Sequence, residues 1–235
     1  MPSDHYYEET DFSETIEDVM NSTDREKLLT LGIKPTSPEI SYGYIQFSDA
    51  EKDKTIKKVV LFKEKPNLEK AKDYLSSGGF YWNSGIFIFD SSFIIKEFNE
   101  HINVTNDLKF TFNEQNNVIT ILEEEFIQLP NISIDYAILE SSKNTYTSEF
   151  KGKWSDLGSW NHLRDHNADS KGSNSSIGNK IYFQDSSNNL VFSKNRTIGI
   201  SGLSDIAVID TPDALLVTNL VERENPNEIL EKSGV

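Results

Sequence analysis

The chain has 235 residues, a net charge of −15 and no cysteine. This length can form one large domain, or a larger domain with a small second one, and 36% hydrophobic residues suffice for a folded core. The charge argues against nucleic acid or an anionic membrane as a partner, and the lack of cysteine excludes disulfides, thiol catalysis and Cys-ligated zinc.

The N-terminus, MPSDHYYEETDF, carries no apolar leader. No later stretch reaches the roughly 18 apolar residues of a membrane span. With the absence of cysteine, this predicts a cytoplasmic protein. The next segment, DFSETIEDVM, places Asp11 as an N-cap before apolar residues at helical spacing, which predicts a short helix.

Four segments after the first helix have strand patterns, and a second helix is predicted between the third and the fourth. Asn67 is placed to cap a helix over 68–77, which Gly78 and Gly79 end. We expect Trp82 to Gly85 to form a loop before the last of these strands. The predicted strands cover residues 27–33, 42–47, 56–65 and 85–89.

Apolar spacing at i, i+3 and i+4 predicts three helices, over residues 91–102, 119–129 and 133–142. A further strand is expected over 144–150. This mixture of strands and helices predicts an α/β layer domain that binds ligands at the C-terminal ends of its strands.

The sequence changes character after residue 168. Residues 169–176, DSKGSNSS, are polar, and short apolar triplets between turn residues continue to 219. We expect a small all-β unit of parallel-helix or sandwich type, followed by a final helix over 226–234. The predicted domains are therefore 1–168 and 169–235, and the apolar triplets of the second are anchored by Ile181, Val191, Ile198, Ile206, Val208 and Leu215.

Two aspartates are candidate Mg²⁺ ligands. Asp4 lies near the expected end of a strand, and Asp156 lies within KWSDLGSW, just before a helix. Carboxylates in such places bind Mg²⁺ when phosphates share its coordination shell. Each aspartate alone could equally cap a turn or a helix.

The segments SYGYI, FKEKP and YWNSG carry the candidate ligand contacts. Gly43 would let a ligand approach the backbone, or be a bulge glycine. Pro66 should end the strand and favours an extended Lys65, so that Glu64 and Lys65 point apart unless a bulge intervenes. Such a pair could bind sugar hydroxyls and a phosphate, or simply be solvated. The aromatic residues beside Asn83 suit a sugar ring, although a structural turn is the alternative.

The four histidines show no metal or triad pattern. His162 and His166 are four residues apart, but no H-E-x-x-H arrangement surrounds them, which favours surface histidines. There is no G-x-S-x-G and no P-loop, so hydrolase and P-loop readings are not supported.

Seven segments occur in one order: MPSDH, LGIKPTSPEISYGYI, FKEKPN, WNSGIFIFD, SIDYAILE, KWSDLGSW and DTPDALLV. Together they resemble the bacterial mannose-1-phosphate guanylyltransferase family. The resemblance implies a Rossmann-like transferase domain followed by a small left-handed β-helix. It also implies a reaction in which mannose 1-phosphate attacks the α-phosphorus of GTP, GDP-mannose forms and pyrophosphate leaves.

The same resemblance implies roles for particular residues. Asp4 and Asp156 match the positions that bind Mg²⁺, and Lys65 matches the lysine that meets the sugar phosphate. Ser133 and Asp135 lie in a matching segment without an assigned role. The positions that match sugar contacts are Gly43, Tyr44, Glu64 and Asn83.

One family segment has no counterpart in the sequence: the Gly-rich nucleotide-binding turn of the G-G-x-G-T-R kind. At ~30 residues per βα unit, about 90 residues would be absent. We therefore expect an open sheet edge, poor stability or self-association, and no turnover by the chain alone. It could act as a homodimer or with a complementing N-terminal fragment. The alternative is a non-catalytic remnant that binds a sugar phosphate or a partner subunit.

Overall fold

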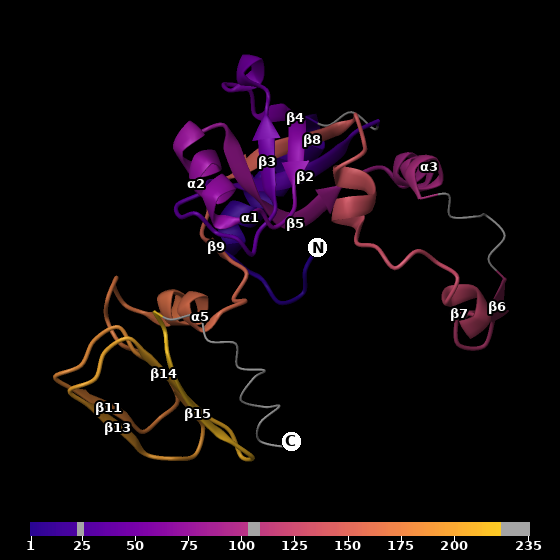
Figure 1. The fold of residues 1–235 in the computed structure, drawn as a ribbon. Coiled ribbons are helices and arrows are strands. Elements are labelled where there is room, and N and C mark those ends of the chain that lie inside the picture. The colour runs from indigo at the N-terminus through magenta and orange to yellow at the C-terminus, as the bar shows by residue number, and fades with distance from the viewer. Residues whose placement is uncertain (23–25, 103–108, 222–235) are drawn as a thin grey trace. The chain divides into compact units, whose positions relative to one another are not determined.

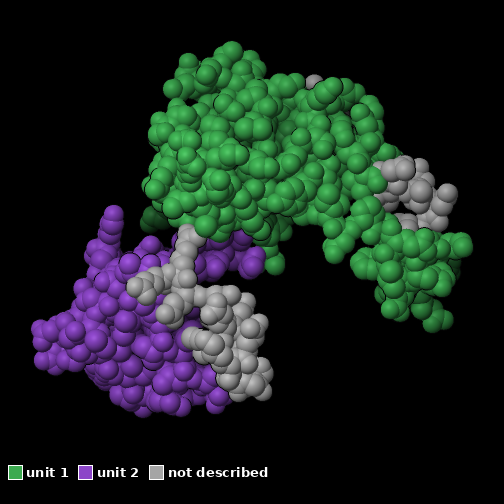
Figure 2. Space-filling model, viewed as in Figure 1, with its two compact units in different colours: residues 1–3, 7–153 green, residues 4–6, 154–235 purple. Residues whose placement is uncertain are grey.

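The computed structural model describes residues 1–22, 26–102 and 109–221 (Figure 1). The final helix expected over 226–234 lies outside the described residues. The chain forms two compact units (Figure 2), which are described separately below. We call residues 1–3 and 7–153 the N-terminal unit, and residues 4–6 and 154–235 the C-terminal unit.

A closed five-stranded barrel forms the centre of the N-terminal unit. Its strands follow one another in the order β2 (Leu28–Ile33), β5 (Phe80–Ile88), β3 (Tyr44–Phe47), β4 (Ile56–Lys63) and β8 (Thr145–Phe150). The β2–β8 pair is parallel, whereas the other pairs are antiparallel. Because β8 pairs with both β2 and β4, the ring closes, and the open edge expected from the sequence is absent from this barrel.

The barrel strands differ in burial, and helices cover part of the barrel: β2 is buried throughout, whereas β4 is exposed at Val60 and Leu61. All six residues of β2 are buried, which is why its sequence, LLTLGI, is apolar without strict alternation. Leu28, Ile45 and Tyr81 pack with residues of helix α3 (Ser91–His101) and of the π-helical segment η2 (Asp135–Leu139). This core fixes the strand ends on which the candidate site is built.

The two helices flanking the central strands largely follow the predicted capping. Asn67 caps helix α2 (Leu68–Ser77) by accepting a 2.9 Å hydrogen bond from the Lys70 amide. Gly78 ends this helix with a left-handed φ of 70°. Helix α1 (Glu9–Ser22) begins before Asp11, so the N-cap predicted there is wrong.

Two segments differ from the sequence-based expectation. The helix predicted over 119–129 is instead strand β7 (Val118–Ile121) and the short helix α4 (Glu123–Phe126). β7 forms a hairpin with β6 (Phe110–Asn113), helped by a positive φ of 54° at Asn117. Residues 82–85 lie within β5 rather than in a loop. A short 3₁₀ helix, η1 (Asp49–Glu51), precedes β4.

Parallel strands dominate the C-terminal unit, which also contains helix α5 (Trp160–Asn167). One sheet joins β10 (Ser175–Ile177), β12 (Leu190–Ser193) and β14 (Ile206–Asp210) in parallel, with β15 (Leu215–Asn219) antiparallel at its end. A second sheet pairs β11 (Ile181–Gln184) with β13 (Ile198–Ser201). Successive segments of chain therefore stack, each strand on the corresponding strand of the segment before.

Apolar side chains and one asparagine hold these stacked segments together. Asn189 is fully buried, donates to Asn174 Oδ1 and Leu203 O, and accepts from the Ile206 amide. Leu215 is 53% exposed, so its predicted role as an anchor is wrong. The other predicted anchors pack in one cluster: Ile181, Val191, Ile198, Ile206 and Val208.

None of the described helices combines the length and the apolar character that crossing a bilayer requires.

Leu190 and Leu215 provide a matched test of the stacked core. Leu190 is fully buried in a cluster with Ala207 and Ile209, whereas Leu215 is largely exposed. Leu190→Ala should lower the free energy of unfolding by about 2 to 5 kcal/mol because it leaves a cavity. Leu215→Ala should change it by less than about 0.5 kcal/mol. Urea denaturation of both variants checks this, and equal losses would contradict the described core.

Candidate functional site

The candidate site of the N-terminal unit begins where Gly43 meets Glu64. Gly43 precedes β3, and its carbonyl accepts a 2.8 Å hydrogen bond from the Asn83 amide of β5. A Cβ on Gly43 would lie 2.5 Å from Glu64 Oε2 and 3.3 Å from the Asn83 Cβ. A side chain at this position would therefore displace the Glu64 carboxylate, which explains why glycine is needed here.

Hydrogen bonds to three other residues hold the Asn83 side chain. Its Oδ1 accepts from Thr30 Oγ1 at 3.0 Å and from the Gly85 amide at 3.2 Å. Its Nδ2 donates to Asp135 Oδ1 at 2.9 Å. A register shift in β2 between Thr30 and Gly32 accompanies this arrangement. The amide is thus oriented in advance of any ligand.

Glu64 and Asp135 are two acidic groups in one partly buried environment. Burial is the main cause that raises the pKa of Glu64, and the negative charge of Asp135 raises it further. Burial also raises the pKa of Asp135, against the hydrogen bond from Asn83, which lowers it. Such carboxyl groups can accept hydrogen bonds from ligand hydroxyls when ionised and donate when protonated.

Lys65 provides the positive charge at this site. Its Nζ lies 3.7 Å from Glu64 Oε1, and its side chain is 63% exposed. The residue has a φ of 45°, and β4 ends at Lys63. The expectation that Lys65 is extended and points away from Glu64 is therefore wrong. The left-handed turn brings the two charged groups together, and backbone strain of this kind is typical of functional sites.

Tyr44 has no exposed surface, whereas Glu64 and Asn83, also predicted to contact sugar, are partly exposed. Its ring packs near the rings of Tyr74 and Phe80, with centroid distances of 5.2 and 6.5 Å. Burial raises the pKa of its hydroxyl. The side chain therefore belongs to the core behind the site.

Sequence reasoning assigned no role to two residues that the structure brings to this site. Asp135 bonds to Asn83 and influences Glu64, and Thr30 bonds to the other end of the same amide. Asp135 lies in SIDYAILE, so its position in that segment was a usable signal. Thr30 is an ordinary strand residue by pattern, and nothing in its neighbourhood would have singled it out.

Asp4 and Asp156 both lie in the C-terminal unit. Asp4 is exposed, two residues before β1 (Tyr6–Tyr7), and Asp156 directly follows β9 (Trp154–Ser155), the strand that pairs with β1. Asp156 Oδ1 lies 2.7 Å from His162 Nδ1. His162 is thus half-buried against an aspartate rather than the solvated surface side chain that we expected.

The surroundings of Asp156 are compatible with a cation. A Cβ on Gly158 would lie 2.6 Å from Asp156 Oδ2, so glycine at this position allows the carboxylate to lie against the backbone. His162 holds the other oxygen of the same carboxylate. Two aspartates supply the oxygen ligands that Mg²⁺ prefers, and Mg²⁺ commonly binds one or two carboxylates together with phosphate.

The family model for nucleotidyl transferases matches residues 1–172. The chain belongs to the nucleotidyl transferase family. The match covers the whole barrel and extends through α5, so the Asn83 and Asp156 groups both lie in the part of the chain that carries the family likeness.

Relatives of this nucleotidyl transferase chain cover nearly all of it. Mannose-1-phosphate guanylyltransferase of Escherichia coli is 30% identical over 99% of the chain and 50% of that relative. Alginate biosynthesis protein AlgA of Pseudomonas aeruginosa is 30% identical over 93% of the chain and 47% of that relative. The chain spans about half the length of the curated relatives it matches.

Solved structures support a mixed α/β nucleotidyltransferase-like fold. A Thermus thermophilus structure described as mannose-1-phosphate geranyltransferase aligns with a TM-score of 0.87 and 24% identity, covering 100% of this chain and 69% of that one. A Helicobacter pylori structure described as mannose-6-phosphate isomerase aligns with a TM-score of 0.56 and 27% identity, covering 66% and 62%.

Glu64 should make stability pH-dependent. Its ordinary pKa is 4.5, and its pKa in the folded chain is higher. Between these values the folded chain keeps a proton that the unfolded chain has lost, so this contribution to stability falls as pH rises through the window. We expect the stability of wild type relative to Glu64→Gln to decrease from about pH 4.5 upward.

Thermal unfolding at a series of pH values measures this difference. A flat difference for Glu64→Gln would show that the Glu64 carboxyl group is not perturbed by burial and by Asp135.

Proposed function

We propose that the chain binds mannose 1-phosphate and forms part of a mannose-1-phosphate guanylyltransferase. In that reaction an oxygen of the sugar phosphate forms a bond to the α-phosphorus of GTP, the bond to the β-phosphate breaks, and GDP-mannose and pyrophosphate result. One observation carries the proposal: the Asn83 side-chain amide is held by Asp135, and Gly43 and Glu64 lie beside Asn83. We call these four residues the Asn83 group. The relatives named mannose-1-phosphate guanylyltransferase favour this substrate.

Sugar recognition requires fixed groups that both accept and donate hydrogen bonds. Glu64 offers a carboxyl group at 13% exposure, close to the backbone of Gly43. Asn83 and Asp135 are already joined, so a hexose would meet groups that lose little freedom on binding. We leave Tyr44 out of the contacting set because its side chain is fully buried.

Lys65 is proposed to meet the phosphate of the sugar. Its ammonium group is exposed, and its partner Glu64 is 3.7 Å away, too far for a strong hydrogen bond. A phosphate dianion can therefore recruit the ammonium without breaking a tight pair. Lysine binds phosphate as a compact point charge, and in phosphoryl transfer such a charge stabilises the transition state.

Asp4 and Asp156 are proposed to hold Mg²⁺ in this chain, with His162 orienting Asp156. When bound, the cation supplies charge neutralisation for phosphate oxygens. Asp156 contributes a carboxylate whose Oδ1 lies 2.7 Å from His162 Nδ1. In this proposal Lys65 binds the sugar phosphate, and the two aspartates bind the metal.

Several further assignments accompany this proposal. We place the domain boundary of the sequence at 168–169, close to the end of the family match at 172, whereas the compact units divide at 153–154. The parallel stacking over 175–210 supports a β-helix in the second domain, with left-handedness carried over from the family resemblance. A cytoplasmic location, and action as a homodimer or with an N-terminal fragment, stay predictions.

Titration calorimetry with mannose 1-phosphate tests the sugar-phosphate site. Lys65→Ala should weaken binding by at least about tenfold, because one charged hydrogen bond to phosphate is lost. The same variant should bind mannose as wild type does. Lys70→Ala, which removes another exposed lysine, is the control. Failure of the wild-type chain to bind mannose 1-phosphate at millimolar concentrations would refute the proposal.

Pyrophosphate release from GTP and mannose 1-phosphate separates the two candidate functions. Turnover by the 235-residue chain itself would demonstrate the transferase reaction. Binding of mannose 1-phosphate without turnover would favour the alternative, a sugar-phosphate-binding chain without catalysis of its own.

Mn²⁺ binding, followed by electron paramagnetic resonance, tests the proposed Mg²⁺ ligands. Asp156→Asn should weaken binding by at least about tenfold, because a direct ligand loses its charge. His162→Gln should give a smaller loss, since His162 acts by orienting Asp156. Asp165→Asn removes an exposed aspartate of α5 that pairs with Arg164, and should have no effect. Equal Mn²⁺ affinity in wild type and Asp156→Asn would eliminate this assignment.

A further inference from the structure

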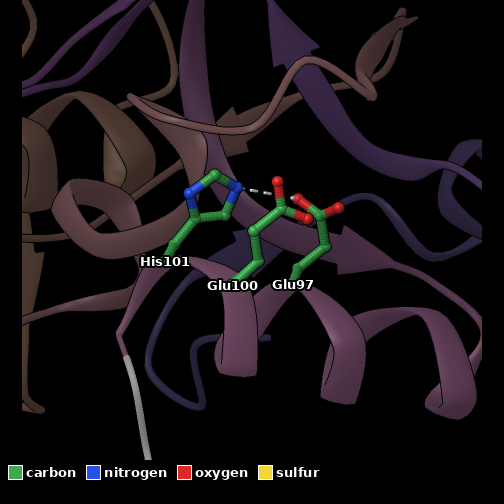
Figure 3. Close-up of side chains that lie close together, drawn as sticks. All are labelled: Glu97, Glu100 and His101. Carbon is green, nitrogen blue, oxygen red and sulfur yellow. Dashed lines mark ion pairs between the residues drawn. The ribbon is translucent and has the colours of Figure 1, made fainter.

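Three potential metal ligands meet at the end of helix α3. Glu97, Glu100 and His101 each offer one ligand atom, and these atoms all lie within 4.8 Å of one another. Spacings of three and four residues place the side chains on one helix face, and Figure 3 shows them converging from the last turns of α3. This group, which we call the α3 cluster, has no part in the proposed transfer reaction.

Glu97 is the unusual member of the α3 cluster. It is 4% exposed, and its Oε2 accepts no hydrogen bond from the part of the chain that the structure describes. His101 Nε2 lies 3.4 Å from the same Oε2, an ion-pair contact. The neighbouring residues Phe93 and Ile94 are buried in the apolar core. A carboxylate in such a place requires compensation by a nearby positive charge.

The charges within the α3 cluster do not balance by themselves. Glu97 and Glu100 bring two negative charges to one turn of helix, and His101 can supply at most one positive charge. The 3.4 Å contact to His101 is also longer than the 2.7–2.9 Å of a charge-assisted hydrogen bond. A divalent cation bound to two carboxylates and a neutral imidazole would make the sum of charges zero.

We propose that the α3 cluster binds a divalent transition-metal cation of the Zn²⁺ class. One imidazole nitrogen and two carboxylate oxygens form a set that Zn²⁺ accepts, with water as a fourth ligand. Mg²⁺ is a poorer match, because it favours oxygen ligands. The cation would neutralise the buried Glu97 and link it to His101.

The separations of the ligand atoms suit this cation. Ligand bonds of about 2.1 Å place tetrahedral ligand atoms about 3.4 Å apart. Glu97 Oε2 and His101 Nε2 are already at that distance. Glu100 is exposed and can change rotamer to complete the set without disturbing the core.

Co²⁺ and Zn²⁺ titrations of the complete, EDTA-treated chain test the site. Co²⁺ should give visible absorption bands, and Zn²⁺ should remove them by displacement. Glu100→Gln and His101→Gln should each weaken Zn²⁺ binding by at least about tenfold. Because Glu100 is exposed, Glu100→Gln should keep the wild-type circular dichroism, so that its effect reports binding rather than folding. Mg²⁺ at the same concentration should not displace Co²⁺.

Two control variants separate the α3 cluster from other acidic groups. Glu123→Gln alters an exposed glutamate of α4, and Asp156→Asn alters the proposed Mg²⁺ ligand; both should retain the Co²⁺ bands. Absence of Zn²⁺ binding by wild type, or unchanged affinity in both Glu100→Gln and His101→Gln, would overturn the proposal. Either result would leave Glu97 and His101 as a simple ion pair. Loss of the bands in Asp156→Asn would equally overturn the assignment to α3.

Discussion

The oriented amide of Asn83 is the interaction on which the candidate site depends. Thr30 fixes its oxygen from β2, and Asp135 fixes its nitrogen from η2, so one side chain of β5 joins three segments far apart in the sequence. These bonds require the barrel to be closed and η2 to pack against it. The same amide bonds to Asp135, whose negative charge adds to the effect of burial in raising the pKa of Glu64; the Glu64 carboxylate lies close to Gly43.

Buried and partly buried carboxyl groups recur in this strongly acidic chain, and each is accommodated differently. Glu64 has Lys65 nearby, Asp135 has an amide donor, and both have raised pKa values because burial disfavours their charged forms. Asp156 has an imidazole at 2.7 Å. Glu97 has an imidazole at 3.4 Å and a buried Oε2 that accepts no hydrogen bond from the described residues, which is why we propose a cation there. The proposed sugar recognition and the proposed cation binding thus both depend on how negative charge is neutralised.

The strands of the two units pair in different arrangements. In the N-terminal unit, β8 closes a ring by pairing with β2 and β4, which come much earlier in the chain. In the C-terminal unit, each strand pairs with the corresponding strand of the neighbouring segment, and Asn189 bonds to the segments on both sides. Closure of the barrel brings residues that are distant in the sequence into contact. In the stacked segments, by contrast, the core repeats from one segment to the next.

Local signals in the sequence were sufficient for the features that depend on near neighbours. Asn67 and Gly78 bounded α2, apolar runs marked β2 and β4, and the spaced residues Val191 and Val208 identified the second core. The sequence patterns did not predict two other local features, the turn at Lys65 and the exposed β6–β7 hairpin. Tertiary structure alone decided the contacts between distant segments, such as the hydrogen bond from Thr30 to Asn83. Barrel closure brings together residues whose own sequence neighbourhoods contain no record of one another.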